Sequence, residues 1–126
     1  WKGFLAEPGF LVVHEGVWLK PDPPAEEREK WSRIFREVFT VEQLLETAGS
    51  CGYDTLGHFV LGEEFWWDEY YSPIGEAVSA LCEEYGADAG AGRILDARRR
   101  EVEMFEGSKE WYGSAYFVMA RRGDAR

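Results

Sequence analysis

The alternation of apolar and polar positions predicts a chain in which strands and amphipathic helices follow one another. Residues 10–13 form a short continuous apolar run after a Pro-Gly turn, which suits a strand buried on both faces. Apolar residues at helical spacing predict two amphipathic helices, over 25–38 and 41–48. Thr40 and Gln43 have the spacing of a capping box for the second of these helices.

The second part of the chain continues the same pattern. Loose alternation predicts a strand over 53–61, helical spacing predicts helices over 74–85 and 93–106, and an apolar run predicts a last strand over 115–120. We expect a small flexible break at the glycines of 86–92. The chain is therefore predicted to have an α/β fold.

The start of the sequence has a consequence for the sheet. A helix end, a Pro-Gly turn and a buried strand form the second half of a βαβ unit, and the first half is not in this sequence. We predict that the strand at 10–13 is an interior member of a larger sheet and that its apolar edge is left exposed here. The chain should then self-associate, exchange segments or be only marginally stable.

Composition and charge exclude several functions. The formal net charge is −10 for 126 residues, which argues against binding to nucleic acid because phosphate contacts need clustered Lys and Arg. Cys51 and Cys82 have neither disulfide-framework nor metal-ligand spacing, which favours a reduced, cytoplasmic compartment. No apolar run reaches about 18 residues, so we expect no membrane segment.

Several segments together resemble the class I methyltransferases that use S-adenosylmethionine. Residues 4–15 resemble the "LLKPGG.L.V.E" pattern through the fifth strand, and 41–59 resemble the "LL..AGY..LGHF.L" segment that leads into the sixth. Residues 66–73 and 111–118 resemble the "WW..YY.P" lid motif and the last strand of a UbiE-related subgroup that acts on small molecules. The family's Lys is Glu7 here and its second Gly is Phe10, so the first of these patterns departs from the family.

This resemblance implies a partial class I methyltransferase fold, with three strands in the order 5-7-6, strand 7 antiparallel and helices on the flanks. Residues 10–13 would be the fifth strand, 55–61 the sixth and 115–120 the seventh. The chain 1–126 would then be the C-terminal, substrate-side portion of a methyltransferase domain.

The resemblance also implies lid or insert segments at 19–38 and 63–107. The cofactor of the longer parent would be S-adenosylmethionine, held by a glycine-rich loop in the N-terminal half. Gly86, Gly90 and Gly92 follow a predicted helix rather than a strand, so they do not supply that loop. We therefore expect this chain alone to bind no cofactor and to be inactive.

The expected partners follow from the same comparison. They are the missing N-terminal half, a small-molecule methyl acceptor and further copies of the chain in a homo-oligomer, with no nucleic acid and no membrane. A different class of function stays open, namely a non-catalytic module that uses the same aromatic surface to bind a ligand or a partner.

His14 and Glu15 are the candidate catalytic residues. Ligands of open α/β sheets bind outside the carboxyl ends of the parallel strands, and the sequence places both residues at that end of the first strand. A base is needed only where the acceptor atom loses a proton, and Tyr112 is a third residue of suitable type. The alternative is a surface His and a solvated Glu, and the sequence does not choose between these interpretations.

The candidate substrate-binding residues are aromatic. Such rings can exclude water from a site and attract a cationic group, and the alternative is that they pack as core. They are Trp18, Trp31, Trp66, Trp67, Tyr70, Tyr71, Trp111 and Tyr112. His58 is interpreted as a structural residue of a strand, and the spacing of His and carboxylate residues predicts no metal site.

Overall fold

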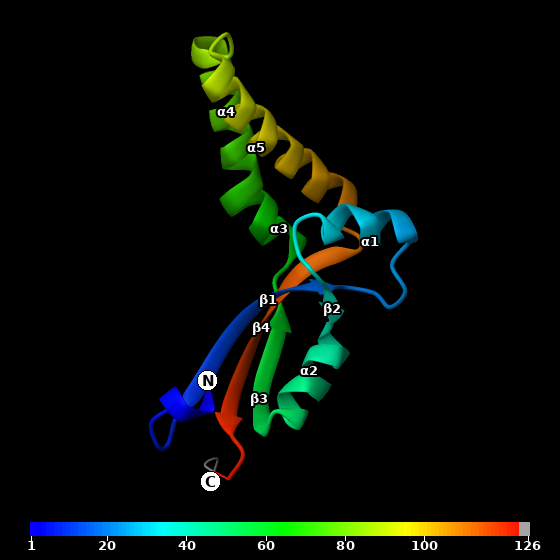
Figure 1. Ribbon diagram of the computed structural model, residues 1–126, viewed down its shortest axis with the longest axis vertical. Coiled ribbons are helices and arrows are strands. Elements are labelled where there is room, and N and C mark those ends of the chain that lie inside the picture. Colours follow the sequence, from blue (N-terminus) through cyan, green and yellow to red (C-terminus); the bar gives the residue numbers. More distant parts are fainter. Residues whose placement is uncertain (124–126) are drawn as a thin grey trace. The chain divides into compact units, whose positions relative to one another are not determined.

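The computed structural model describes residues 1–123, and they divide into two compact units (Figure 1). One unit, here called the sheet unit, consists of Trp1–Leu61 and the segment that begins at Trp111. The other, here called the helical unit, is Gly62–Glu110. The helical unit contains the predicted insert at 63–107.

The sheet has four strands in the order β2-β1-β4-β3. They are β1 (Phe10–Trp18), β2 (Phe39–Thr40), β3 (Tyr53–Val60) and β4 (Tyr112–Arg121). The long strand β4 lies between β1 and β3 and runs antiparallel to both, whereas β2 pairs with β1 in parallel. The three strands predicted by the sequence are present and adjacent, β1 and β4 are longer than predicted, and β2 was not predicted.

Two α-helices belong to the sheet unit, α1 (Ala25–Ser32) and α2 (Val41–Ser50), after a 3-10 turn at Lys2–Phe4. The predicted capping box of α2 is confirmed. The Thr40 hydroxyl accepts from the Gln43 amide at 3.3 Å, and the Thr40 amide donates to Gln43 Oε1 at 2.9 Å. These bonds satisfy amide groups that the first turn of a helix leaves free.

The predicted helix over 25–38 is wrong in its second half, because α1 ends at Ser32. The amides of Ile34 and Phe35 both donate to the carbonyl of Trp31, which closes the helix in a turn. From there the chain extends so that Phe39 can pair with Val17 of β1. The strand pairing is tertiary, and here it overrides the helical periodicity of the local sequence.

The core of the sheet unit lies between the sheet and α2. Val17, Phe117 and Met119 point from the sheet into this layer and are at most 6% exposed. The apolar face of α2 covers them with Leu44 and Leu45, and Figure 1 shows the helix alongside the strands. Burial of each such side chain contributes about 1.5–3 kcal/mol, so this layer stabilises the unit.

The helical unit is built on a hairpin of two helices, α4 (Ser72–Tyr85) and α5 (Ala89–Ser108). A short helix α3 (Glu63–Trp66) and a π-helical turn η2 (Trp67–Tyr71) precede them.

The predicted break over 86–92 is shorter than expected. Asp88 caps α5 by accepting from the amides of Gly90 and Ala91, so the helix begins before its glycines. In residues 1–123, no helix has the length and apolar character needed to cross a membrane.

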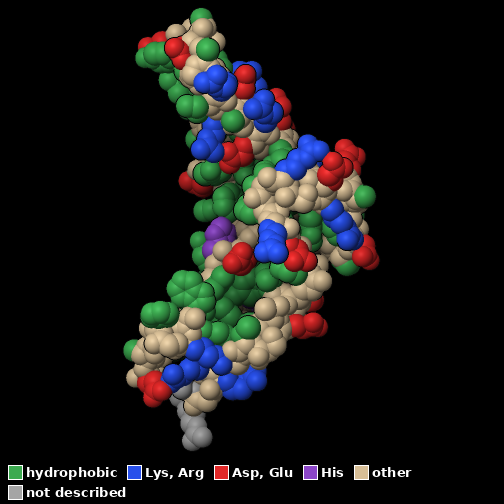
Figure 2. Space-filling view, viewed as in Figure 1, with side chains coloured by type: hydrophobic (Ala, Val, Ile, Leu, Met, Phe, Trp, Pro, Cys, Tyr) green, Lys and Arg blue, Asp and Glu red, His purple; other side chains and the backbone are tan. Residues whose placement is uncertain are grey.

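One edge of β1 is unpaired over most of its length. Every residue from Phe10 to Trp18 pairs with β4, but on the other side only Val17 and Trp18 pair with β2. Among the described residues, no strand covers the remaining edge. Phe10 and Val12 are 62% and 59% exposed, and Figure 2 shows apolar side chains gathered over the strands of the sheet unit. Such an edge favours pairing with another chain.

We expect Val12→Lys to weaken self-association of the chain by about tenfold or more, equivalent to about 1.4 kcal/mol, since a charged side chain on an unpaired edge opposes pairing. Sedimentation velocity over a range of concentrations measures the effect. Ile94→Lys is the matched control, because Ile94 is 66% exposed in a helix rather than at a sheet edge. A wild-type chain that stays monomeric at high concentration, or an equal effect of both substitutions, would contradict the expectation.

Candidate functional site

An aromatic cluster surrounds the carboxyl end of β1. Trp18 is the last residue of β1 and pairs with Tyr112, the first residue of β4, so that their rings meet edge to face at 6.2 Å. Trp31 of α1 stacks on Tyr112 at a centroid distance of 3.6 Å, and Phe35 is nearly parallel to it at 6.2 Å. These four residues are here called the ring cluster. Trp18 and Trp31 are 8% and 3% exposed and are core, whereas Tyr112 is half-buried and Phe35 is 44% exposed.

Tyr112 is held over a glycine. A Cβ atom at Gly16 would overlap the Tyr112 hydroxyl, so the phenol crosses β1 where the strand has no side chain. Burial raises the pKa of Tyr112 from 10.0 to about 12, and the charge of Glu15 adds to this shift. Loss of the Tyr112 proton is therefore less favourable than in an ordinary tyrosine.

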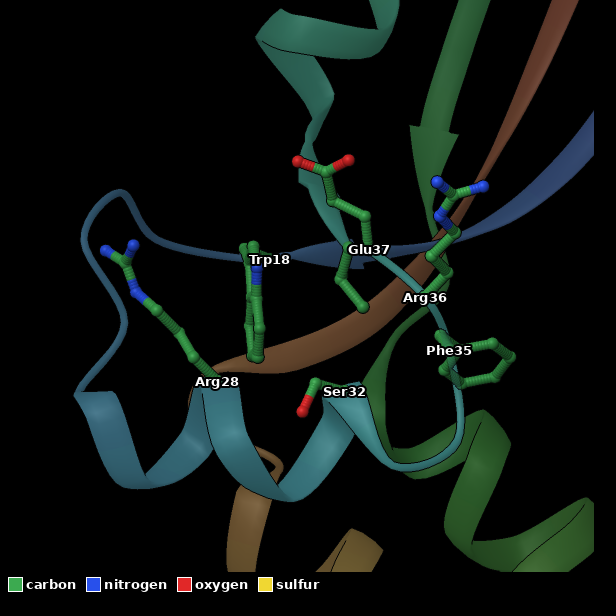
Figure 3. A pocket seen from close by; sticks show the side chains of 7 residues that line it. Trp18, Arg28, Ser32, Phe35, Arg36 and Glu37 are labelled. Carbon is green, nitrogen blue, oxygen red and sulfur yellow. The ribbon is translucent and has the colours of Figure 1, made fainter.

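A pocket of about 230 Å³ opens beside the ring cluster (Figure 3). Its lining comes from the end of β1, from α1 and from the segment that leads to β2, and consists of Trp18, Arg28, Ser32, Phe35, Arg36, Glu37 and Val38. In Figure 3, Arg28 and Arg36 extend on opposite sides of Trp18, and Glu37 lies between them. The pocket thus combines ring surface with separated charges of both signs.

The charged residues of this pocket were not among the candidates from the sequence. A helix over 25–38 would have made Arg36 and Glu37 ordinary solvent-exposed helix charges. Their position follows instead from the end of α1 at Ser32 and from the pairing of β2 with β1. The available signal was weak, namely the Pro-rich turn before α1, which fixes where the helix begins.

His14 and Glu15 do not lie at the end of the strand, contrary to the expectation. β1 continues to Trp18, because it pairs with β4 through Gly16 without interruption. Successive residues of a strand point to opposite faces, so the two side chains also lie on different sides of the sheet. The structure therefore does not bring the two candidates together, and their catalytic role remains a prediction.

The surroundings of these two residues differ. His14 Nε2 lies 2.9 Å from the hydroxyl oxygen of Ser114, and the His14 ring stacks on Tyr116 at 4.5 Å. Phe59 extends this stack from the other side of Tyr116 at 5.4 Å. Glu15 instead lines an apolar cavity of about 190 Å³ on the α2 side of the sheet, together with Leu11 and other core residues. His14 therefore has a hydroxyl at hydrogen-bond distance and stacked rings beside it, whereas Glu15 borders a largely apolar cavity.

The aromatic residues of the helical unit divide into core and surface. Tyr71 is 8% exposed and stacks on Phe105 of α5 at 4.0 Å, so it belongs to the core of this unit. Trp66 is half-buried and meets Tyr70 edge to face at 5.8 Å. Trp67 and Tyr70 are 36% and 39% exposed, so these two have ring surface available to a ligand.

Trp111 and His58 each contact another residue of the sheet unit. The ammonium group of Lys20 lies 5.1 Å from the ring centroid of Trp111, a distance at which cation–π attraction acts. His58 lies on β3 with its ring 6.0 Å from that of Phe117. Within residues 1–123, no group of three or more His, Cys, Asp or Glu side chains is placed to hold a metal ion.

The fold of this chain resembles solved structures, whereas its sequence matches no known family. No protein-family model matches the sequence, and no curated protein does. Among solved structures, YjhP from E. coli matches with a TM-score of 0.77 at 19% identity, over 99% of this chain and 51% of that one. A SAM-dependent methyltransferase from Geobacter sulfurreducens, in complex with S-adenosyl-L-homocysteine, matches with a TM-score of 0.73 at 16% identity, over 90% of this chain and 46% of that one.

The chain has the fold of part of a SAM-dependent methyltransferase. It spans about half the length of the two structures just named. The same fold also matches the [4+2]-cyclase SpnF, with a TM-score of 0.60 at 17% identity over 92% of this chain and 39% of that one. At these identities the likeness establishes the fold, and the fold alone does not establish the reaction.

Gly16→Ala should destabilise the sheet unit by about 1–3 kcal/mol, because the added methyl group displaces the Tyr112 ring. Urea unfolding measures the loss. Gly57→Ala is the control in a strand, since a Cβ there meets no atom within 4 Å. The cost of Gly16→Ala should shrink in a Tyr112→Ala background, and an undiminished cost there would contradict the explanation.

The raised pKa of Tyr112 predicts a dependence of stability on pH. Its pKa is about 12 in the folded chain against 10.0 for the ordinary group, so the unfolded chain loses the proton first. The free energy of unfolding should therefore be unaffected by this group below pH 10 and fall as the pH rises from 10 to about 12. Tyr112→Phe should flatten that fall in urea titrations, and identical slopes for both proteins would show that Tyr112 does not cause it.

Proposed function

We propose that this chain is the C-terminal, substrate-side portion of an S-adenosylmethionine-dependent methyltransferase of the UbiE-related subgroup, acting on a small molecule in the cytoplasm. The observation that carries the proposal is that 90% or more of the chain follows about half of such a methyltransferase structure. In this proposal β1, β3 and β4 are the fifth, sixth and seventh strands of the complete sheet. The order β1-β4-β3, with β4 antiparallel to both neighbours, agrees with that assignment.

The sheet unit would supply the wall of the acceptor site. Open α/β sheets bind their ligands outside the carboxyl ends of the strands, and the ring cluster with its pocket lies at that end of β1. The helical unit would act as the lid, with the half-exposed rings of Trp67 and Tyr70 as its contact surface. His14 would be the first candidate for a base where the acceptor must lose a proton, because of its polar and aromatic surroundings.

The residues of this chain do not fit the cofactor itself. A nucleoside cofactor of this fold class needs a glycine-rich turn between a strand and a helix. The loop after β1 is rich in proline instead, and the loop from β3 into α3 offers the single glycine Gly62. In the proposed division of labour, the cofactor is held by the N-terminal portion of the longer protein.

That N-terminal portion would also cover the unpaired edge of β1. Phe10 and Val12 are more than half exposed there, which fits a strand whose neighbour is supplied by another segment or by another copy in a homo-oligomer. The second candidate function is a ligand-binding module without methyl transfer. It is favoured by the pocket at the end of β1, because all seven lining residues come from the sheet unit.

Calorimetric titration of S-adenosylmethionine into this chain and into a longer protein that contains it tests the proposal. We expect binding by the longer protein and none by the 126-residue chain. Adenosine serves as the control ligand for recognition of the nucleoside alone. Binding of S-adenosylmethionine to this chain with equal affinity would refute the division of labour, and a longer protein that binds none would favour the second candidate.

A further inference from the structure

The pocket at the end of β1 holds charges that have little compensation within the protein. Among the described residues, neither Arg36 nor Glu37 has an ion-pair partner for its side chain. Arg28 is oriented by its Nε, which donates to the Pro23 carbonyl at 3.0 Å. Its guanidinium group also lies 3.7 Å from Asp22, whose side chain is 98% exposed, so that this ion pair is weak.

The rest of the lining is apolar or already engaged. The Ser32 hydroxyl donates its hydrogen to the Glu29 carbonyl at 2.8 Å, so it can only accept a hydrogen bond from a ligand. Trp18, Phe35 and Val38 supply apolar surface next to the charges. A molecule that fills the pocket therefore needs an apolar body and charged groups of both signs, in a volume of about 230 Å³.

We propose that this pocket binds a small amphoteric molecule that carries both a carboxylate and a protonated amine. The carboxylate pairs with Arg36, with Arg28 as a second cation across the pocket, and the amine pairs with Glu37. The apolar body lies against Trp18 and Phe35. A purely anionic ligand would meet the Glu37 carboxylate, and a purely cationic ligand would meet Arg36, so a molecule with both charges fits best.

The charge order in Figure 3 supports this choice over a phosphate-bearing ligand. Arg28 and Arg36 lie on opposite sides of Trp18 rather than side by side, so they do not form a clamp around one dianionic group. Glu37 lies between them and would repel such a group. The inference rests on the proposed function only in taking the bound molecule to be the methyl acceptor, because binding requires no cofactor and no methyl transfer.

Three probes of similar shape test the pairing of charges. L-phenylalanine carries both charges, 3-phenylpropanoate carries only the carboxylate, and 2-phenylethylamine carries only the amine. Each is titrated into the ¹⁵N-labelled 126-residue chain, with the indole signal of Trp18 and the amides of Arg36 and Glu37 as reporters. L-phenylalanine should bind more tightly than either single-charge probe by about fivefold, as expected for a partly exposed ion pair.

Substitutions should separate the two charges. Glu37→Gln should weaken the binding of L-phenylalanine and 2-phenylethylamine by about fivefold and should not weaken the binding of 3-phenylpropanoate. Arg36→Gln should weaken the binding of L-phenylalanine and 3-phenylpropanoate by a similar factor and should not weaken the binding of 2-phenylethylamine. Arg33→Gln is the matched control, because Arg33 pairs with Glu29 at 2.7 Å and does not line the pocket. Both pocket residues are exposed, and the same spectra report whether each variant is folded.

The outcomes are distinct. The crossed pattern of effects supports the inference, whereas no saturable shift at the reporters, equal affinity for all three probes, or an equal effect of Arg33→Gln would overturn it. Failure of the proposed function is read separately, from titration of S-adenosylmethionine into the longer protein. Binding of L-phenylalanine through Arg36 and Glu37 would support this inference even if the protein transfers no methyl group.

Discussion

The antiparallel pairing of β1 with β4 is the interaction on which the other features of the sheet unit depend. It joins segments about a hundred residues apart in sequence, as the contact between His14 and Ser114 illustrates. Because every residue of β1 takes part, the register fixes Tyr112 opposite Trp18 and places its phenol over Gly16. Trp31 then stacks on Tyr112, which positions α1 and with it the wall of the pocket. A shift of one residue would turn all of these side chains to the opposite face.

The sequence was sufficient for the elements whose signal is local. The apolar runs of β1 and β4 and the capping box at Thr40 each depend on neighbouring residues. The capping box is confirmed, and both strands contain the predicted runs but extend beyond them. The elements that failed depend on distant partners. β2 consists of only Phe39 and Thr40, and it exists because β1 offers an unpaired edge at Val17. The same pairing ends the helix predicted over 25–38.

The candidate site follows the same division. The sequence named the aromatic residues as candidates for substrate contact or for core, and it did not separate the two roles. Trp31 and Tyr71 are core, whereas Trp67 and Tyr70 keep exposed ring surface. Arg36 lines the pocket only because the segment between α1 and β2 is not helical. Charged residues carry little information about their surroundings, because the same residue types are normal on any exposed helix.

The helical unit interrupts the chain between two neighbouring strands of the sheet unit. β3 and β4 are neighbours in the sheet, with Val60 paired to Ala115, so Gly62–Glu110 is an insertion into what would otherwise be a β-hairpin. The Leu61 amide donates to the Ser114 carbonyl at 2.9 Å, which closes the base of the insertion within the sheet unit. The register of β3 and β4 is therefore set by the sheet and not by the insert. Changes in the α4–α5 hairpin can then occur without disturbing the strand pairing that forms the pocket.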